Sequence, residues 1–239
     1  MKLFSAIKTQ EIEFLCDKED VGVIPEPYQA KKLMPNWFKA LPPKLGKGGL
    51  ESSTIKRCNP FLDAMSVGWI IPLAADVQFT TNEDASGVNY KWSFYKPMIE
   101  NHSKEQISTD KAPNPLTPKP PMKFMNYWII RAPKDYSLLF VPPLNRPDPR
   151  FQCLSGMVDC DGYFEYVNFP FTFNQPDFHG IIEAGTPLVQ VIPIKRSTLD
   201  IKTTIAEMDL ADKEELELTR RKRASHESLY RDKIWSKKP

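Results

Sequence analysis

The scarcest reactive side chain in this sequence is histidine, and one histidine lies between two carboxylates. The 239 residues contain His102, His179 and His226. Asp177 precedes His179 by two residues, and Glu183 follows it by four. Two histidines and one carboxylate can hold iron(II) and leave positions open for oxygen and substrate. His179, Glu183 and Asp177 are therefore the predicted ligands of a divalent metal in a jelly-roll oxygenase, with His102 as a second histidine.

The spacing around His179 also supports a simpler interpretation. Neither His102 nor His179 begins the H-x-D or H-x-E pattern of such oxygenases. On a strand, residues four apart share a face but lie about 13 Å apart, so His179 and Glu183 could share an ion only if the chain bent at Gly180. The alternative is an exposed loop histidine, which is the commoner role.

Three further side chains are candidates for ligand binding. Gln190 falls on the apolar face of the segment LVQVIPI, where an amide needs hydrogen-bond partners. A core glutamine bonded to the backbone is the commoner alternative to a ligand contact. Trp69 and Trp92 could stack on a sugar, a nucleotide base or a peptide, although such rings more often fill a β-protein core.

Paired aspartates and the common enzyme motifs give little further support for catalysis. Asp159 and Asp161 flank Cys160 and could bind a hard cation. Turn aspartates more often accept backbone N–H bonds, and we favour that role. The sequence contains no phosphate-binding loop, dinucleotide-binding, nucleophile-elbow or zinc-protease motif. These enzyme classes therefore gain no support from it.

The stretch from Phe151 to Arg196 would position most of these residues. Its alternating apolar side chains are Val167, Phe169, Phe171 and Phe173. Alternation of this kind predicts a strand with one face toward a core. Asp161-Gly162 suits a hairpin turn before that strand, with Phe151–Val158 as its partner. A second turn, Ala184–Pro187, leads into the strand that carries Gln190.

Other segments predict further strands and short helices. Strand patterns occur at Lys2–Ile7, Glu11–Leu15, Trp69–Thr81, Tyr90–Tyr95, Met125–Arg131, Tyr136–Val141 and Leu199–Ile205. A polar turn around Gly87 predicts one hairpin, and the residues APKD predict another between Met125–Arg131 and Tyr136–Val141. Short helices are predicted at Met34–Pro42 and after Asn59. The proline-rich stretch 101–121 is expected to cross the surface as an extended loop.

The C-terminal segment has a different character. Acidic residues crowd its first turns and Arg220–Arg223 follow, an order that suits the helix dipole and i,i+4 pairing. Asp212, with Glu215 three residues later, predicts a capping box. The apolar stripe is thin, so the helix is expected to lie on the surface or project from it. We divide the chain into a single β-rich domain, residues 1–206, and a C-terminal helical extension, residues 207–239.

Composition and charge narrow the classes of partner. Lys and Arg number 32 against 30 Asp and Glu, a net charge of +2, so no large field favours nucleic acid. The most apolar run, Gly68–Ala75, is far too short to cross a bilayer, and the first residues lack the apolar region of a secretory signal. The 4 cysteines form no C-x-x-C pair and are expected to be reduced. These features predict a soluble cytoplasmic protein with neither a membrane nor a nucleic-acid partner.

Three segments resemble a known family. They are NPFLDAMSVGWIIPLAADV (59–77), LLFVPPLNRPDPRF (138–151) and PDFHGIIEAGTPLVQVIPIKR (176–196). Over nearly its whole length the chain resembles a family of uncharacterised proteins from marine tailed phages, cyanobacteria and other bacteria. The resemblance implies a bacterial or phage-infected cell as the source. It carries no established activity and assigns no functional residue.

Together these features predict a mainly β fold, an antiparallel jelly-roll, sandwich or barrel-like structure with short early helices and a charged C-terminal helix. The leading functional hypothesis is a non-catalytic binding or assembly protein, such as a phage accessory or virion component. The projecting helix would suit contacts in a homo-oligomer. The alternatives are a metal-dependent jelly-roll enzyme and a module that recognises a sugar, nucleotide or peptide.

Overall fold

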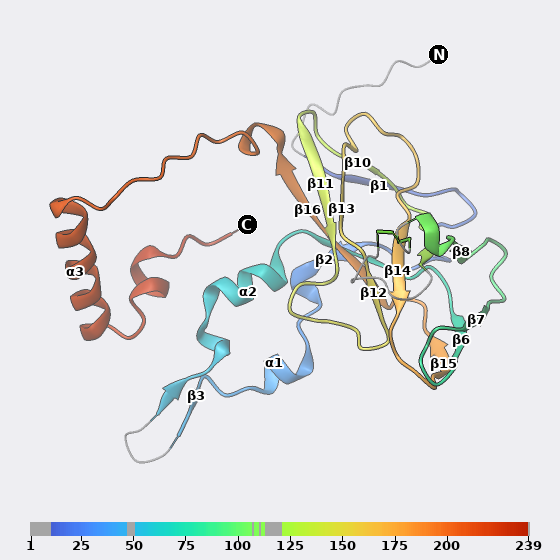
Figure 1. Cartoon of the computed structure of the whole chain (residues 1–239), viewed down its shortest axis with the longest axis horizontal. Helices are drawn as coiled ribbons and strands as arrows, with labels where there is room; N and C mark the ends of the chain where they lie inside the picture. The colour runs from blue at the N-terminus through green and yellow to red at the C-terminus, as the bar shows by residue number, and fades with distance from the viewer. Residues whose placement is uncertain (1–10, 47–50, 107, 110, 113–120, 239) are drawn as a thin grey trace. The chain divides into compact units, whose positions relative to one another are not determined.

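The computed structural model describes residues 11–46, 51–106, 108–109, 111–112 and 121–238. The predicted strand Lys2–Ile7 and part of the predicted loop 101–121 lie outside these residues. The described chain is mainly β, with antiparallel strand pairs and few helices (Figure 1). The mainly β fold class is thus confirmed. No helix of the described residues is long and apolar enough to cross a membrane.

The described strands are short, and most lie in small antiparallel sheets. They are β1 (Glu13–Leu15), β2 (Tyr28–Gln29), β3 (Lys44–Leu45), β4 (Ser52–Ser53), β5 (Trp69–Pro72), β6 (Val77–Thr81), β7 (Val88–Lys91), β8 (Ile99–Asn101), β9 (Met122–Phe124), β10 (Ile129–Arg131), β11 (Tyr136–Val141), β12 (Phe151–Cys153), β13 (Gly156–Val158), β14 (Phe169–Phe173), β15 (His179–Ile182) and β16 (Pro187–Lys195).

The helices are also short, except for the one near the C-terminus. The α-helices are α1 (Asn36–Ala40), α2 (Asn59–Ser66) and α3 (Leu210–Ser225). The 3₁₀-helices are η1 (Ala30–Lys32), η2 (Ile55–Arg57), η3 (Lys104–Gln106) and η4 (Arg196–Thr198), and η5 (Tyr230–Ile234) is a π-helix. The two predicted short helices are confirmed as α1 and α2.

The chain divides into two compact units. Unit 1 contains the described residues up to Pro35 together with Ala64–Arg196, and it holds every described strand except β3 and β4. Unit 2 contains Asn36–Asp63 and the described residues from Ser197 onward. Asn36–Asp63 therefore groups with the C-terminal residues. This division differs from a single boundary at residue 206.

The largest sheet of unit 1 is built around β16. Its strand order is β13-β11-β16-β5-β2, with antiparallel pairing throughout. The residues from Leu188 to Val191 are all buried, so both faces of β16 are covered, and the segment reads as a nearly continuous apolar run. Gly68, with φ 75°, precedes β5 at a close approach, where an added Cβ would lie 1.9 Å from the Val191 carbonyl oxygen. Only glycine fits there.

An aromatic core joins two smaller sheets of unit 1. These sheets have the orders β12-β14-β9-β8 and β15-β6-β7. Phe171 of β14 stacks on Phe124 with ring centroids 3.7 Å apart, and Phe173 packs on Phe79 of β6 at 4.8 Å. Phe169 is buried as well. The predicted core face of this strand is confirmed, and each buried ring contributes roughly 1.5–3 kcal/mol of transfer free energy.

The predicted pairing of neighbouring strands is only partly correct. β6 and β7 form the predicted hairpin, with its turn around Gly87. β12 pairs with β14 as predicted, but β13 pairs with β11 instead. The hairpin predicted across APKD is wrong, because β10 pairs with β1 whereas β11 pairs with β13 and β16. No sheet of the described residues closes on itself, so the jelly-roll, sandwich or barrel-like arrangement stays a prediction.

Candidate functional site

The predicted metal ligands lie along an edge strand of unit 1. His179 is the exposed first residue of β15 and pairs with Thr80 of β6. Glu183 is exposed and follows the end of β15, so strand rise places it about 13 Å further along the chain. Asp177, with φ 48°, occupies the preceding turn, where its N–H donates to the Asn82 carbonyl. Among the described residues, no three His, Cys, Asp or Glu side chains form a group that could hold a metal ion.

The other two histidines make local contacts. The His102 Nδ1 atom lies 2.8 Å from the Gln106 Oε1 atom. The His226 Nε2 atom lies 3.0 Å from an Asp232 carboxylate oxygen. Among the described residues, His102 belongs to no metal-binding group with His179, Asp177 or Glu183.

Gln190 is the centre of a buried hydrogen-bond network. Its amide nitrogen donates to the carbonyls of Ala64 and Val67 at 2.9 and 2.6 Å. Its Oε1 atom accepts from the Leu144 N–H and from an Arg146 Nη atom, both at 3.0 Å. All four hydrogen-bonding positions of the amide are thus used. Gln190 is therefore a core glutamine with a structural role, which is the commoner alternative to a ligand contact. Two of its four partners, Leu144 and Arg146, lie in the loop 142–149.

Arg146 extends this network to an earlier segment. Its other Nη atom donates to the carbonyls of Ala30 and Leu33 at 3.1 and 2.9 Å. Burial lowers the pKa of Arg146 from its usual high value, but an arginine remains charged at neutral pH. A single guanidinium therefore fixes the loop 142–149 against η1 and β16.

The two candidate tryptophans contact other rings of unit 1. Trp69 is half-buried, and its ring centroid lies 6.3 Å from that of Phe14. Trp92 is half-buried and stacks on Tyr90 at 5.8 Å with an interplanar angle of 15°. Both rings therefore help to pack unit 1, and ligand stacking on them stays a prediction.

A cleft of unit 1 lies beside the loop that Arg146 holds. Its volume is about 370 Å³, within the range of small-molecule sites. Prolines and aliphatic side chains form most of its wall, with Asn145, Gln152 and Ser155 as exposed polar residues. Arg150 binds both carboxylate oxygens of the lining residue Asp148 at 2.9 and 2.7 Å. The cleft could hold an apolar group of a ligand, but it presents no free carboxylate pair for acid–base chemistry.

Cys153, in the wall of this cleft, is not an activated nucleophile. The thiol is buried, and burial raises its pKa. The thiolate is the reactive form of cysteine, so this environment suppresses reactivity. All four cysteines are free thiols, as predicted.

A second polar cluster of unit 1 was missed by the sequence analysis. Asp20 is completely buried, and its carboxylate accepts hydrogen bonds from Lys96 Nζ at 2.6 Å and from the Tyr95 hydroxyl. Lys96 also donates to Asp17 at 2.9 Å. Burial opposes the charge of Lys96, but the hydrogen bonds to Asp20 and Asp17 outweigh it and raise the Lys96 pKa. A lysine held in its charged form is neither a base nor a nucleophile, so this cluster anchors the loop after β1.

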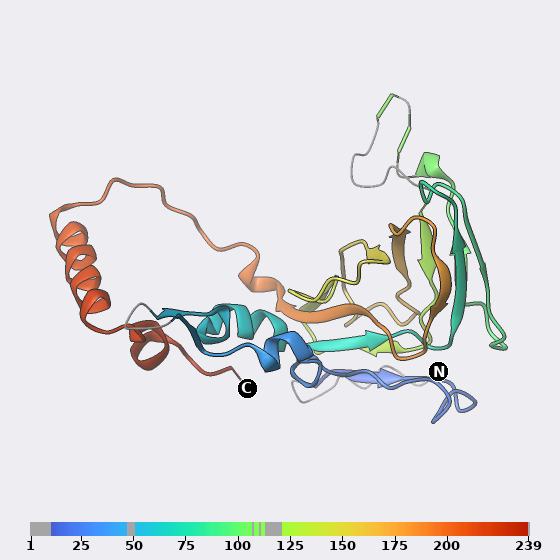
Figure 2. The ribbon, with the colours of Figure 1, turned by 90° about the horizontal axis from the view of Figure 1, so that it is seen from below.

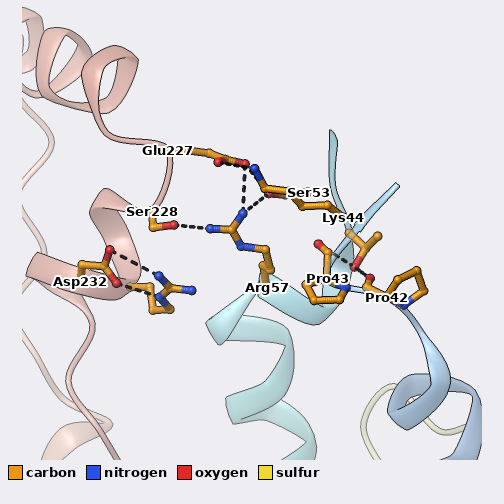
Figure 3. A network of polar contacts seen from close by, with 10 residues as sticks. Pro42, Pro43, Lys44, Ser53, Arg57, Glu227, Ser228 and Asp232 are labelled. Atoms are coloured by element: carbon orange, nitrogen blue, oxygen red, sulfur yellow. Dashed lines mark hydrogen bonds and ion pairs between the residues drawn. The ribbon is translucent and has the colours of Figure 1, made fainter. Parts of the chain in front are cut away.

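In unit 2 the residues after α3 are attached to the segment that contains β3, β4 and η2. Figure 3 shows Glu227 accepting hydrogen bonds from Ser53 at 2.7 Å and Arg57 at 3.1 Å, and pairing with Lys44 at 3.0 Å. Arg57 also donates to the Ser228 hydroxyl. These contacts attach the residues that follow α3 to the segment 44–57 of unit 2. The C-terminal end of α3 is therefore held in place.

Acid should release this attachment. Hydrogen bonds from Ser53 and Lys44, with the charge of Arg57, lower the pKa of Glu227 to about 2 from an ordinary 4.5. Because the folded-state pKa is the lower one, the contribution of Glu227 is present above about pH 4.5 and disappears as the pH falls toward 2. Glu227→Gln should remove this acid dependence, measured as hydrogen exchange of the residues near 227.

The matched control for Glu227→Gln is a carboxylate that precedes α3. Glu207→Gln changes an exposed carboxylate that forms no ion pair with the described residues, and it should leave the acid dependence in place. A Glu227 carboxylate that titrates near 4.5, observed by carbon NMR, would contradict the prediction.

Every residue of the C-terminal arm, defined as residues 197–225, is exposed. Figure 2 shows the backbone of the arm in orange to red, from η4 through α3. Its exposed large apolar side chains are Leu199, Ile201, Ile205, Met208, Leu210, Leu216 and Leu218. Ile205 is 97% exposed, although burying such a side chain is worth roughly 1.5–3 kcal/mol. This concentration of apolar surface on one segment is typical of a protein interaction site.

The first part of the arm forms no strand: after η4 and a turn at residues 199–200, residues 201–209 have no regular secondary structure. Leu199, Ile201 and Ile205 alternate with polar residues and so predicted a strand. The prediction is wrong for the single chain, because the structure assigns no strand after β16 in the described residues. Within that part of the chain, residues 199–208 also form no hydrogen bond or ion pair with the rest. Leu199, Ile201 and Ile205 have the spacing of a half-buried strand, but their side chains are exposed in the described structure.

The second part of the arm is α3, which has a well-formed N-terminal cap but no buried side chain. Asp209 caps the helix, and its side chain and that of Asp212 form a reciprocal capping box. The cap thus lies three residues before the predicted one. No residue of the 16-residue helix is buried, whereas isolated helices of that length are marginal in water and usually depend on packing.

Comparisons with known proteins give no relative from which a role could be transferred. No protein-family model matches the chain, and no curated protein matches it. The resemblance to uncharacterised phage and bacterial proteins therefore stays a prediction. The function has to be argued from the surfaces themselves.

Proposed function

We propose that this protein is a non-catalytic binding and assembly protein that forms homo-oligomers through its C-terminal arm. The observation that carries the proposal is an arm of consecutive exposed residues that includes alternating apolar side chains. Burying such side chains against another subunit removes apolar surface from water, which is the main driving force of association.

The chain supplies both halves of a strand-addition contact. Residues 201–205 have no regular secondary structure, and their backbone forms no hydrogen bond within the described residues. Unit 1 has sheets with edge strands, such as β13, where Met157 is 46% exposed. An extended segment can add to a sheet edge, where backbone bonds give affinity and alternate side chains give specificity. The arm of one copy is proposed to add to a sheet of another.

The biological setting that we propose follows from the sequence resemblance. A virion or accessory component of a tailed phage, or of its bacterial host, would use such an arm to join neighbouring subunits. Exchange of an arm between identical subunits is a low-cost route to a closed oligomer.

The test is the mass of the full chain over a range of concentrations, measured by light scattering. The wild-type mass should rise with concentration. Ile201→Ser with Ile205→Ser should weaken self-association at least about 100-fold, because burying two isoleucines contributes roughly 3–6 kcal/mol. Both residues are exposed in the single chain, so the melting temperature of the monomer should not change.

The matched control changes the other face of the same segment. Lys202→Ser with Ala206→Ser should leave self-association within about twofold of wild type, since surface substitutions have small effects. A protein that stays monomeric at every concentration would overturn the proposed function. So would an isoleucine variant that assembles like the wild type.

A further inference from the structure

Except for Lys213, the charges of α3 lie in two blocks along the helix. The acidic block contains Asp212, Glu214, Glu215 and Glu217, and the basic block contains Arg220, Arg221, Lys222 and Arg223. One short-range pair joins the blocks, between Arg220 and Glu217 at 2.6 Å. Within the described residues, Glu214, Glu215, Arg221 and Lys222 form no ion pair. Most of the charge of each block is therefore available to another molecule.

One face of α3 combines these charges with exposed apolar side chains. Leu210, Glu214, Leu218 and Arg221 follow each other at intervals of four, four and three residues, which places them on one face of the helix. Leu210 is 79% exposed and Leu218 is 51% exposed. The centre of the face is thus apolar at Leu218, with an acidic residue on the N-terminal side and a basic residue on the C-terminal side.

We infer that α3 pairs with the α3 of a second copy in an antiparallel orientation, with the acidic block of each helix against the basic block of the other. The inference rests on the proposed function, since it names the partner surface for the second part of the arm. A two-fold axis near Leu218 would bring the two Leu218 side chains together. It would also place Glu214 and Glu215 opposite Arg221 and Lys222 of the second copy.

The same charges select against other arrangements. In a parallel pair the acidic blocks would face each other, and so would the basic blocks, which is unfavourable. Each exposed ion pair contributes little by itself. The charges therefore choose the orientation and the partner, while the apolar side chains of the arm provide the affinity.

The test uses two charge-reversed variants of the full chain, Glu214→Lys with Glu215→Lys, and Arg221→Glu with Lys222→Glu. Each variant alone faces like charges in the antiparallel pair, so its self-association should weaken by at least about tenfold. An equimolar mixture should recover association and form mixed pairs, because the two variants are complementary to each other. The chain with all four substitutions should also recover. Sedimentation measures all four samples.

Crosslinking gives a second measurement that does not depend on charge. In a Cys58→Ser background, Leu218→Cys should form a disulfide-linked dimer on mild oxidation, because the two-fold axis passes near this position. Thr219→Cys, whose side chain points about 100° around the helix from position 218 and away from the paired face, should crosslink far less and is the matched control.

Three results would overturn the inference. A mixture of the two charge variants that does not recover, or equal crosslinking at positions 218 and 219, would exclude the antiparallel helix pair. If Ile201→Ser with Ile205→Ser still weakened assembly, the proposed function would stand and only the helix pairing would fail. A wild-type chain that is monomeric at every concentration would overturn both.

Discussion

Replacing Lys96 with methionine is expected to lower the free energy of unfolding by about 3–5 kcal/mol. Asp20 is completely buried, and Lys96 is the only cation among the described residues that pairs with it. Without Lys96, a carboxylate would remain in a low-dielectric site, and among the described side chains the Tyr95 hydroxyl would be its one hydrogen-bond donor. Urea unfolding of the full chain, followed by circular dichroism, measures the change.

A second lysine provides the control for Lys96→Met. Lys123 pairs with Glu100, whose side chain is 55% exposed, so Lys123→Met should lower the free energy of unfolding by less than about 1 kcal/mol. Combining Lys96→Met with Asp20→Asn should recover part of the loss, because no charge is then left buried. A loss below about 1 kcal/mol for Lys96→Met would show that Asp20 does not depend on this partner.

Replacing Arg146 with methionine is the second substitution with a large expected effect. It would remove one charged donor from each of three acceptors: the carbonyls of Ala30 and Leu33, and the Gln190 amide oxygen. The Ala30 carbonyl would keep the Leu33 N–H, and the amide oxygen would keep the Leu144 N–H. Hydrogen bonds to a charged group contribute about 1.5–3 kcal/mol each, so losing three of them should lower the free energy of unfolding by roughly 3 kcal/mol or more. Hydrogen exchange at Leu144 should also accelerate, because its N–H donates to the same amide oxygen.

Arg146→Lys separates charge from geometry in this network. Lysine keeps the charge but lacks the planar fork that reaches acceptors in several directions, so it should recover only part of the lost stability. A double-mutant cycle of Arg146→Met with Gln190→Leu should show coupling between the two residues. Strict additivity would mean that the Arg146–Gln190 hydrogen bond contributes nothing to stability.

Alternation and turn chemistry were sufficient to predict several elements of the fold. The buried phenylalanines of β14 were predicted because side chains alternate between two faces, which is a local property. The β6–β7 hairpin was predicted because Gly87 and polar neighbours mark its turn. The APKD segment looked equally like a hairpin turn, but β10 and β11 pair with distant strands. A local pattern cannot show which distant strand provides the better apolar contact.

The candidate sites were predicted less well than the fold. Gln190 was correctly singled out as a polar residue on an apolar face, but its partners are 44 to 126 residues away in sequence. Asp20 and Lys96, 76 residues apart, carry no motif that would link them. Buried charge is the physical signal of that cluster, and burial is a property of the folded chain.

The sequence by itself determined the mainly β character, the short early helices, the charged C-terminal helix and the alternating pattern of residues 199–205. Each of these depends on side-chain periodicity, capping or turn residues within a few positions of one another. Only the tertiary structure decided which strands pair, which charges are buried and that residues 197–225 remain exposed. Those outcomes depend on long-range packing, in which the apolar area removed from water selects among local alternatives. The alternating side chains of the arm are not packed against the described residues, and for this reason we propose that they serve contacts between chains.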